Sequence, residues 1–175
     1  MARIPIHGLT NGQLVERARH SLSRGHGVAR RVHRQVMREG RFQPDRFGLG
    51  PEALAGWSES FSFTLPEILR IESDESGHGQ TSKVVLRLDD GLEAEAVSIP
   101  MGRGRHTLCV SSQVGCKMRC AFCETGRMGL LRHLRAEEIV AQLLVARHQL
   151  GWPIRNVVFM GMGEPLANYR NVIPA

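Results

Sequence analysis

The spacing of apolar and polar residues changes near residue 60 of the 175-residue chain. Before that point, three stretches have the apolar spacing of amphipathic helices: residues 11–23, 28–37 and 51–57. In the first stretch Leu14, Ala18 and Leu22 are each four positions apart, which places them on one face of a helix. Residues 1–60 are therefore predicted to form a small helical module, whose parts are separated by Gly and Pro.

Alternation of apolar and polar residues replaces the helical spacing between residues 61 and 104. The alternating stretches, which predict strands, are residues 67–72, 83–88 and 93–99. Residues 74–80 and 89–91 are rich in Asp, Gly and Ser and predict turns. We expect a small β segment here, ending in a linker at residues 100–104.

The remaining residues, 105–175, have the order of an α/β domain. Short apolar runs at residues 107–112 and 156–160 predict two buried strands, and the amphipathic residues 135–150 predict a helix between them. This order predicts that the two strands pair in parallel. Two such strands cannot close a barrel, so we expect the α/β domain to be incomplete.

Positive charge is concentrated at the start of the chain. The net charge is +6, and the first 46 residues contain ten arginines but only three acidic residues. Such a basic module is typical of proteins that bind nucleic acids, although solvent-exposed arginine-rich helices explain the same composition. The chain has no apolar run of the roughly 20 residues that a membrane span needs, and no secretory signal. We expect a cytoplasmic protein with no membrane partner.

All four cysteines lie between positions 109 and 123, which favours a metal or redox site over a disulfide scaffold. Cys116, Cys120 and Cys123 have the spacing C-x3-C-x2-C. Three thiolates on one short loop can each bind one iron of a cubane iron–sulfur cluster and leave the fourth iron open. A zinc site with His106 or His133 as a further ligand is the alternative.

A second segment, Gly161-Met-Gly163-Glu164-Pro165, directly follows the second predicted strand. Ligands of open α/β sheets bind beyond the carboxyl ends of the strands. Glycines permit close approach of the backbone to a ligand, and Glu164 can accept a hydrogen bond from an ammonium group. A plain turn with a solvated glutamate is the alternative. From the residues alone, Cys109 is interpreted as a small buried strand residue.

Two long stretches resemble one known family. Residues 107–129 (TLCVSSQVGCKMRCAFCETGRMG) and 156–168 (NVVFMGMGEPLAN) are similar to signature segments of the RlmN/Cfr family of radical S-adenosylmethionine (SAM) RNA adenosine methyltransferases. Weaker similarity covers residues 82–100 and reaches into the helical module. The resemblance implies an α/β fold, in which the helical module and the β segment precede the first part of a partial (β/α) barrel. It also implies a [4Fe-4S] cluster and SAM as cofactors.

The resemblance implies a role for each matching residue. The metal ligands would be Cys116, Cys120 and Cys123, and the SAM-binding residues Gly161, Gly163, Glu164 and Pro165. Cys109 matches a catalytic cysteine that resolves a covalent enzyme–RNA adduct by forming a disulfide. Glu95 matches a glutamate implicated in chemistry at the base. Glu124 departs from the family, in which a small residue usually follows the last cluster cysteine, and this puts the subfamily in doubt.

The activity implied is methylation of an adenosine carbon of 23S rRNA, with tRNA as a further substrate and C2 favoured over C8. An electron donor such as flavodoxin and a monomeric state belong to the same expectation. Family members carry a methyl-bearing cysteine near their C-terminus, and no cysteine follows Cys123 here. We therefore expect an incomplete chain that is inactive alone. The alternatives are a radical SAM enzyme for another class of substrate and an inactive iron–sulfur or RNA-binding fragment.

Overall fold

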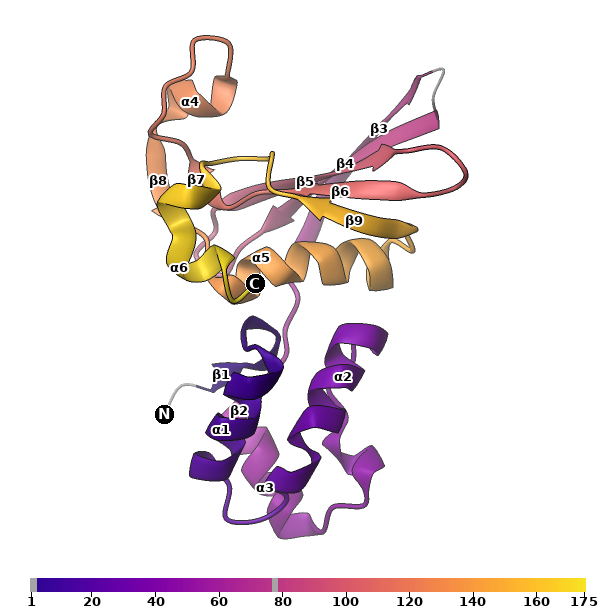
Figure 1. Ribbon diagram of the computed structural model, residues 1–175, viewed down its shortest axis with the longest axis vertical. Coiled ribbons are helices and arrows are strands. Elements are labelled where there is room, and N and C mark those ends of the chain that lie inside the picture. Colours follow the sequence, from indigo (N-terminus) through magenta and orange to yellow (C-terminus); the bar gives the residue numbers. More distant parts are fainter. Residues whose placement is uncertain (1–2, 77–78) are drawn as a thin grey trace. The chain divides into compact units, whose positions relative to one another are not determined.

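The computed structural model describes residues 3–76 and 79–175, and the chain forms two compact units (Figure 1). The first unit consists of Met1–Thr64 with Pro174–Ala175, and the second of Leu65–Ile173. In the part of the chain that the structure describes, no helix has both the length and the apolar character needed to cross a membrane.

The first unit consists mainly of helices. Its α-helices are α1 (Asn11–Ser21), α2 (Ala29–Glu39) and α3 (Pro51–Ser60). Its 3₁₀ turns are Ile6–Gly8, His26–Val28 and Pro44–Phe47. A short parallel pair, β1 (Ile4–Pro5) with β2 (Phe61–Ser62), brings the two ends of the unit together.

Local sequence explains where these helices begin and end. Thr10 and Gln13 form a capping box at the start of α1, in which the Gln13 amide donates to the Thr10 hydroxyl at 3.2 Å. Gly40 ends α2 in a left-handed conformation. The apolar faces of the helices meet around the fully buried Trp57, whose indole N–H donates to the Gly25 carbonyl at 3.1 Å.

The second unit contains a five-stranded sheet in the order β3–β4–β5–β6–β9. Its strands are β3 (Glu67–Ser76), β4 (Gly79–Arg87), β5 (Glu93–Pro100), β6 (His106–Val110) and β9 (Ile154–Val158). Neighbours are antiparallel except for β6 and β9, which pair in parallel with Cys109 opposite Val158. Because β6 and β9 run in the same direction, their carboxyl ends lie side by side, and the segments that follow them meet there.

Helix α5 (Ala136–Leu144) lies between the two parallel strands in the chain and continues into a π-helical turn, Val145–Gln149. It packs on one face of the sheet (Figure 1), where Leu108 of β6 shares a core with Val145 and Ala146. The crossover helix is thus held by apolar contacts, which fixes the strand ends on either side of it.

The segment between β6 and α5 forms a second, smaller sheet, in which β7 (Gln113–Gly115) pairs antiparallel with β8 (Leu130–His133). The cysteine loop connects these two strands and contains the short helix α4 (Glu124–Met128). After β9 come a 3₁₀ turn, Pro165–Asn168, and helix α6 (Tyr169–Val172).

The predicted strand–helix–strand order and its parallel pairing are confirmed by β6, α5 and β9. Several details differ. Asp74 pairs with Thr81 and extends β3 instead of forming a turn, while the predicted turn residues 77–78 lie outside the described residues. The expected linker at 100–104 joins the antiparallel neighbours β5 and β6 within one sheet. Strand β9 lies at the sheet edge, so its Val157 is exposed and not buried.

Candidate active site

Main-chain hydrogen bonds join the segment after β6 to the segment after β9. The Gly161 amide donates to the Val110 carbonyl at 3.1 Å. The Met162 carbonyl accepts from the amides of Ser112 and Gln113 at 2.8 and 3.2 Å. These bonds continue the β6–β9 pairing beyond the strands and hold the predicted SAM-binding segment against the start of the cysteine loop.

Close packing at this junction requires Gly161 and Gly163. A Cβ atom on Gly161 would lie 2.8 Å from the Val110 carbonyl oxygen, and one on Gly163 would lie 2.5 Å from Cβ of Gln113. Gly163 also has a φ of +99°, which other L residues rarely adopt. The sequence suggests that these glycines let the backbone approach a ligand. In the structure they let the segment lie directly against the end of β6.

The same junction is stabilised by two buried side chains, Ser111 and Gln142, that the sequence analysis does not identify. The Ser111 hydroxyl donates to the Glu95 carbonyl at 2.6 Å and accepts from the Met162 amide at 3.0 Å. The Gln142 side chain of α5 bonds both the amide and the carbonyl of Ser111, at 2.8 and 2.9 Å. Gln142 follows Ile139 by three positions on the buried face of α5, and a polar residue at such a position is the signal that identifies it.

Gln113 and Asn168 complete the buried polar contacts of the junction. Gln113 Oε1 accepts from the Glu164 amide at 2.8 Å. Asn168 Nδ2 donates to the carbonyls of Ser112 and Leu134 at 2.8 and 2.7 Å. Because buried polar groups are costly unless paired, these contacts define one arrangement of the two segments.

The loop between β7 and β8 carries the three cysteines of the C-x3-C-x2-C spacing. Cys116 is buried, Cys123 is half-buried and Cys120 is exposed. The Cys123 amide donates to the Cys120 carbonyl at 3.0 Å, and the Gly126 amide donates to the Cys123 carbonyl at 3.1 Å. A Cβ atom on Gly126 would lie 3.1 Å from the Cys120 amide nitrogen, so the loop folds tightly around its last two cysteines.

In the described residues, no three Cys, His, Asp or Glu side chains converge where they would share one metal ion. A cubane cluster makes a different demand, because each cysteine binds a different iron and the sulfurs surround the cluster. Three thiols on one loop therefore fit a cluster by the chemistry of the donor set. The two histidines considered for zinc have other partners, since His106 Nδ1 lies 2.8 Å from Ser98 Oγ and His133 Nδ1 lies 2.9 Å from Gln113 Nε2.

Cys109 lies on β6, the strand that leads into the cysteine loop. The residue is 8% exposed. Burial raises the pKa of its thiol, and a hydrogen bond from the Met160 amide opposes this only in part. A protonated thiol is a weak nucleophile, so a redox role for Cys109 requires a base or greater access to solvent.

Glu164 and Pro165 begin the 3₁₀ turn that follows the glycine segment. Glu164 Oε1 accepts from the Leu166 amide at 3.0 Å and so caps this turn. The capping contact is the one expected of a plain turn. A carboxylate accepts several hydrogen bonds, so the second oxygen of Glu164 retains the capacity to bind an ammonium group.

A hollow of about 380 Å³ lies beside the cysteine loop. Its lining joins Glu95 of β5, Glu124 of α4 and Met162 of the glycine segment. Glu95 Oε1 lies 3.5 Å from Lys83 Nζ, and Glu124 Oε1 lies 2.8 Å from Arg127 Nη1. The structure thus places the predicted Glu95, and the unusual Glu124, in one cavity with the predicted SAM-binding segment.

An ion-pair network anchors β8 to the start of α5. Arg132 lies 2.8 Å from Glu138 and 2.6 Å from Asp90, which is in the turn between β4 and β5. Burial raises the pKa of Glu138, but hydrogen bonds from Arg132 and from the main chain and side chain of Arg135 outweigh it and hold the pKa below its usual range. These contacts fix the far end of the cysteine loop.

Comparison with known proteins relates this geometry to a family. Residues 110–173 match the model of the radical SAM superfamily. The chain is 45% identical over 159 residues to the probable dual-specificity RNA methyltransferase RlmN 1 of Protochlamydia amoebophila, covering 89% of this chain and 43% of that protein. It is 40% identical over 186 residues to the dual-specificity RNA methyltransferase RlmN of Caulobacter vibrioides. That alignment covers 98% of this chain and 45% of the Caulobacter protein.

The fold also matches a crystal structure of a radical SAM methyltransferase from Sphaerobacter thermophilus, with a TM-score of 0.79 and 34% sequence identity. The match covers 98% of this chain and 50% of the Sphaerobacter chain. The fold is that of a radical SAM protein with an α/β architecture, as predicted, and the cysteine loop lies within the residues that match the superfamily model. Over most of its length the chain is homologous to RNA methyltransferases named RlmN, in agreement with the resemblance found in the sequence. It spans less than half the length of the two curated relatives named above.

Proposed function

We propose that this chain is the part of a radical SAM RNA methyltransferase that holds a [4Fe-4S] cluster and SAM. The enzyme methylates carbon C2 of an adenosine in 23S rRNA, with tRNA as a second substrate. The junction between β6 and β9 carries this proposal, because it holds residues 161–164 against the start of the loop with the three cysteines. The names of the relatives support RNA as the substrate class.

The cysteine loop and the glycine segment bind the two cofactors in this proposal. Cys116, Cys120 and Cys123 hold the cluster, and Glu164 accepts a hydrogen bond from the ammonium group of SAM. When bound, the cluster and SAM supply reductive radical chemistry, which can act on an adenine carbon that is not nucleophilic. An electron donor such as flavodoxin, a monomeric state and a cytoplasmic location belong to the same proposal.

The hollow beside the cysteine loop receives the adenine. Its carboxylates, Glu95 among them, can accept hydrogen bonds from the exocyclic amino group, as acidic side chains do at base edges. Met128 and Met162 line the same hollow, and flexible thioether side chains pack well against aromatic rings. Cys109 serves to release the product, the role that the resemblance implies.

Electron paramagnetic resonance of the anaerobically reconstituted and reduced chain tests the cofactor assignment. We expect a [4Fe-4S]⁺ signal that changes when SAM is added. Cys120→Ser should abolish the signal, and the matched variant Cys109→Ser should retain it, since Cys109 lies outside the cluster spacing. Glu164→Gln should retain the cluster and weaken the response to SAM. A signal indifferent to SAM, or one lost equally in both cysteine variants, would contradict the proposal.

A second arm of this test addresses the substrate in cells. Deleting the gene should remove C2-methyladenosine from one position of 23S rRNA, with any loss from tRNA showing the second substrate. Mass spectrometry of nuclease digests measures both RNAs, and returning the wild-type gene is the control. Unchanged C2-methyladenosine in the deletion strain would rule out the C2 assignment. Loss of C8-methyladenosine would instead assign the activity to carbon C8.

A further inference from the structure

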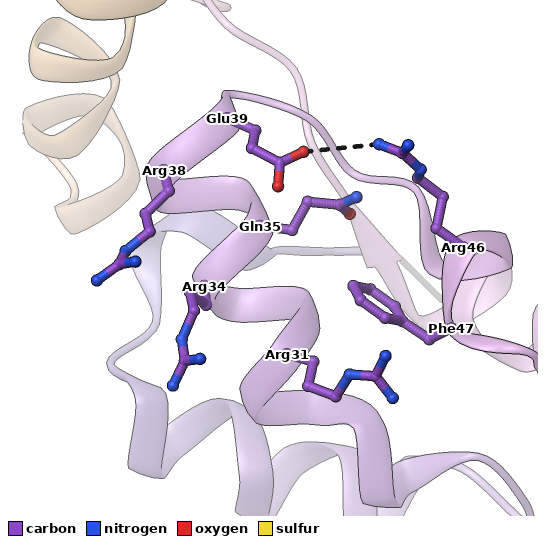
Figure 2. A pocket seen from close by; sticks show the side chains of 7 residues that line it. All are labelled: Arg31, Arg34, Gln35, Arg38, Glu39, Arg46 and Phe47. Carbon is purple, nitrogen blue, oxygen red and sulfur yellow. Dashed lines mark ion pairs between the residues drawn. The ribbon is translucent and has the colours of Figure 1, made fainter.

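The first unit contains an arginine-lined hollow that the cofactor site does not use. The hollow has a volume of about 470 Å³ and lies where α2 faces the 3₁₀ turn Pro44–Phe47 (Figure 2). Its lining includes four arginines and one acidic residue: Arg31, Arg34, Arg38, Arg46 and Glu39. A hollow of this size is within the range of small-molecule sites and accommodates a nucleotide.

Helical spacing places three of these arginines in one stripe. Arg31, Arg34 and Arg38 are three and four positions apart, and side chains at such positions are neighbours on a helix surface. The opposite face of α2 is anchored in the core through Val32 and Val36, both fully buried. The stripe is therefore held in a fixed orientation by the packing behind it.

Most of the positive charge in the hollow is unneutralised. In the described part of the first unit, acidic side chains pair with Arg24 and Arg46 and leave Arg34 and Arg38 without an acidic partner. The Arg46–Glu39 pair has a separation of 3.8 Å, and both side chains are more than half exposed, so it is weak. A site with several unpaired arginines attracts a polyanion.

Phe47 supports one arginine at the edge of the hollow. The guanidinium carbon of Arg31 lies 4.6 Å from the centre of the Phe47 ring, a cation–π contact that restrains the guanidinium group. Figure 2 shows Phe47 pointing from its turn toward α2, with Arg31 beside it. Gln35 Oε1 accepts from the Gln43 amide at 3.0 Å and so ties the segment before the turn to α2. An exposed and restrained guanidinium group is a surface on which an unpaired base can stack.

We propose that this hollow is a docking site for the RNA substrate. Arg34, Arg38 and Arg46 contact backbone phosphates, and Arg31, supported by Phe47, stacks on an unpaired base. The inference rests on the proposed function, because that function makes RNA the substrate. Phosphate contacts supply affinity that depends on salt, and the stacked base favours a loop over a continuous duplex.

Fluorescence anisotropy with a labelled RNA stem–loop, measured on the whole chain at several salt concentrations, tests the phosphate contacts. Arg34→Ala with Arg38→Ala should weaken binding roughly tenfold and reduce the slope of log K against log salt by about 1 to 2. The matched control is Arg17→Ala with Arg19→Ala, two exposed arginines of α1 outside the hollow. The control should keep most of the affinity. Unchanged binding in the hollow variant, or equal losses in both, would overturn the site.

A charge-conserving variant tests the stacking contact. Arg31→Lys should weaken binding of the stem–loop about fivefold, leave the salt slope unchanged, and affect a fully paired duplex less, because lysine keeps the charge but has no planar group on which a base can stack. Equal affinity for both RNAs in the variant and the wild type would overturn the stacking contact. If the wild-type chain binds no RNA, the RNA substrate itself is wrong, whereas the cluster measurement is unaffected.

Discussion

Gly163 shows how a single residue decides whether the site can form. Its positive φ and the nearness of Gln113 each exclude a side chain. The neighbouring Glu164 amide donates to Gln113 Oε1, so a shift at Gly163 would also disturb the contact that positions Glu164. The backbone at this residue thus connects the predicted SAM-binding carboxylate to the strand that leads to the cysteines.

Gly163→Ala should lower the free energy of unfolding of the second unit by about 1–3 kcal/mol, since the new Cβ is both strained and obstructed. Gly91→Ala is the matched control, because Gly91 has a φ of +82° but open space around it. Urea denaturation in a Trp57→Phe background, followed by the fluorescence of Trp152, measures both variants. Equal losses in the two variants would show that packing against Gln113 contributes nothing.

Individual site residues differ in how far the sequence predicts them. Cys116, Cys120 and Cys123 are proposed as ligands from their spacing alone, because they lie on one short loop. Ser111 and Gln142 are not found in this way, since they are 31 positions apart and meet only when α5 packs on the sheet. Buried polar contacts of this kind depend on tertiary structure and leave a weak local signal.

At the scale of elements, the apolar spacing locates the four longest helices and the strands of the five-stranded sheet to within a few residues. The prediction of residues 28–37 as a helix corresponds to α2, and that of 93–99 corresponds to β5. Strands β7 and β8 are not predicted, because they have only three and four residues, too few to show a clear alternation. The ion pairs of Arg132 with Asp90 and Glu138 hold β8 in place and so support its pairing with β7.

The pKa shift of Glu138 predicts how this element responds to acid. The pKa is lower in the folded chain than the value of about 4.3 in the unfolded chain, so the carboxylate stabilises the fold above that value. This stabilisation is lost as the pH falls through the lower, folded pKa. Glu138→Gln should therefore reduce stability at neutral pH and flatten its decline below about pH 4.3.

Thermal unfolding measured from neutral pH down to about pH 3 tests this effect, because the range includes the usual carboxyl pKa. Glu75→Gln is the matched control in the same unit, since Glu75 is exposed. Its stability should follow the wild-type profile. A Glu138→Gln profile that stays parallel to the wild type throughout would mean that the network adds no acid-sensitive stability.

The whole molecule consists of two units with separate cores. The core of the first unit surrounds Trp57, and one of the two apolar clusters of the second unit contains Leu108 with Trp152 packed against it. Each unit therefore has its own tryptophan as a fluorescence reporter. The boundary near Thr64 follows the change from helical to alternating spacing near residue 60, because each pattern buries its apolar residues within its own unit.

Leu14→Ala removes a fully buried side chain from the first core and should destabilise the first unit by about 2–5 kcal/mol. The unfolding midpoint reported by Trp152 should stay at its wild-type value. Denaturation of a Trp57→Phe background, in which Trp152 is the remaining tryptophan, checks this separately. A matching fall in the Trp152 midpoint on adding Leu14→Ala to that background would show that the two cores unfold together.

The long separation between the two halves of the junction has a consequence for synthesis of the protein. Gln113 and Glu164, which bond directly, are 51 positions apart. During translation all three cysteines of the loop are synthesised before the glycine segment. Until β9 pairs with β6, the start of the loop therefore lacks the segment that packs against it. If the chain binds a cluster as proposed, the order of cluster delivery and strand pairing decides whether the cluster forms on a loop that is already anchored.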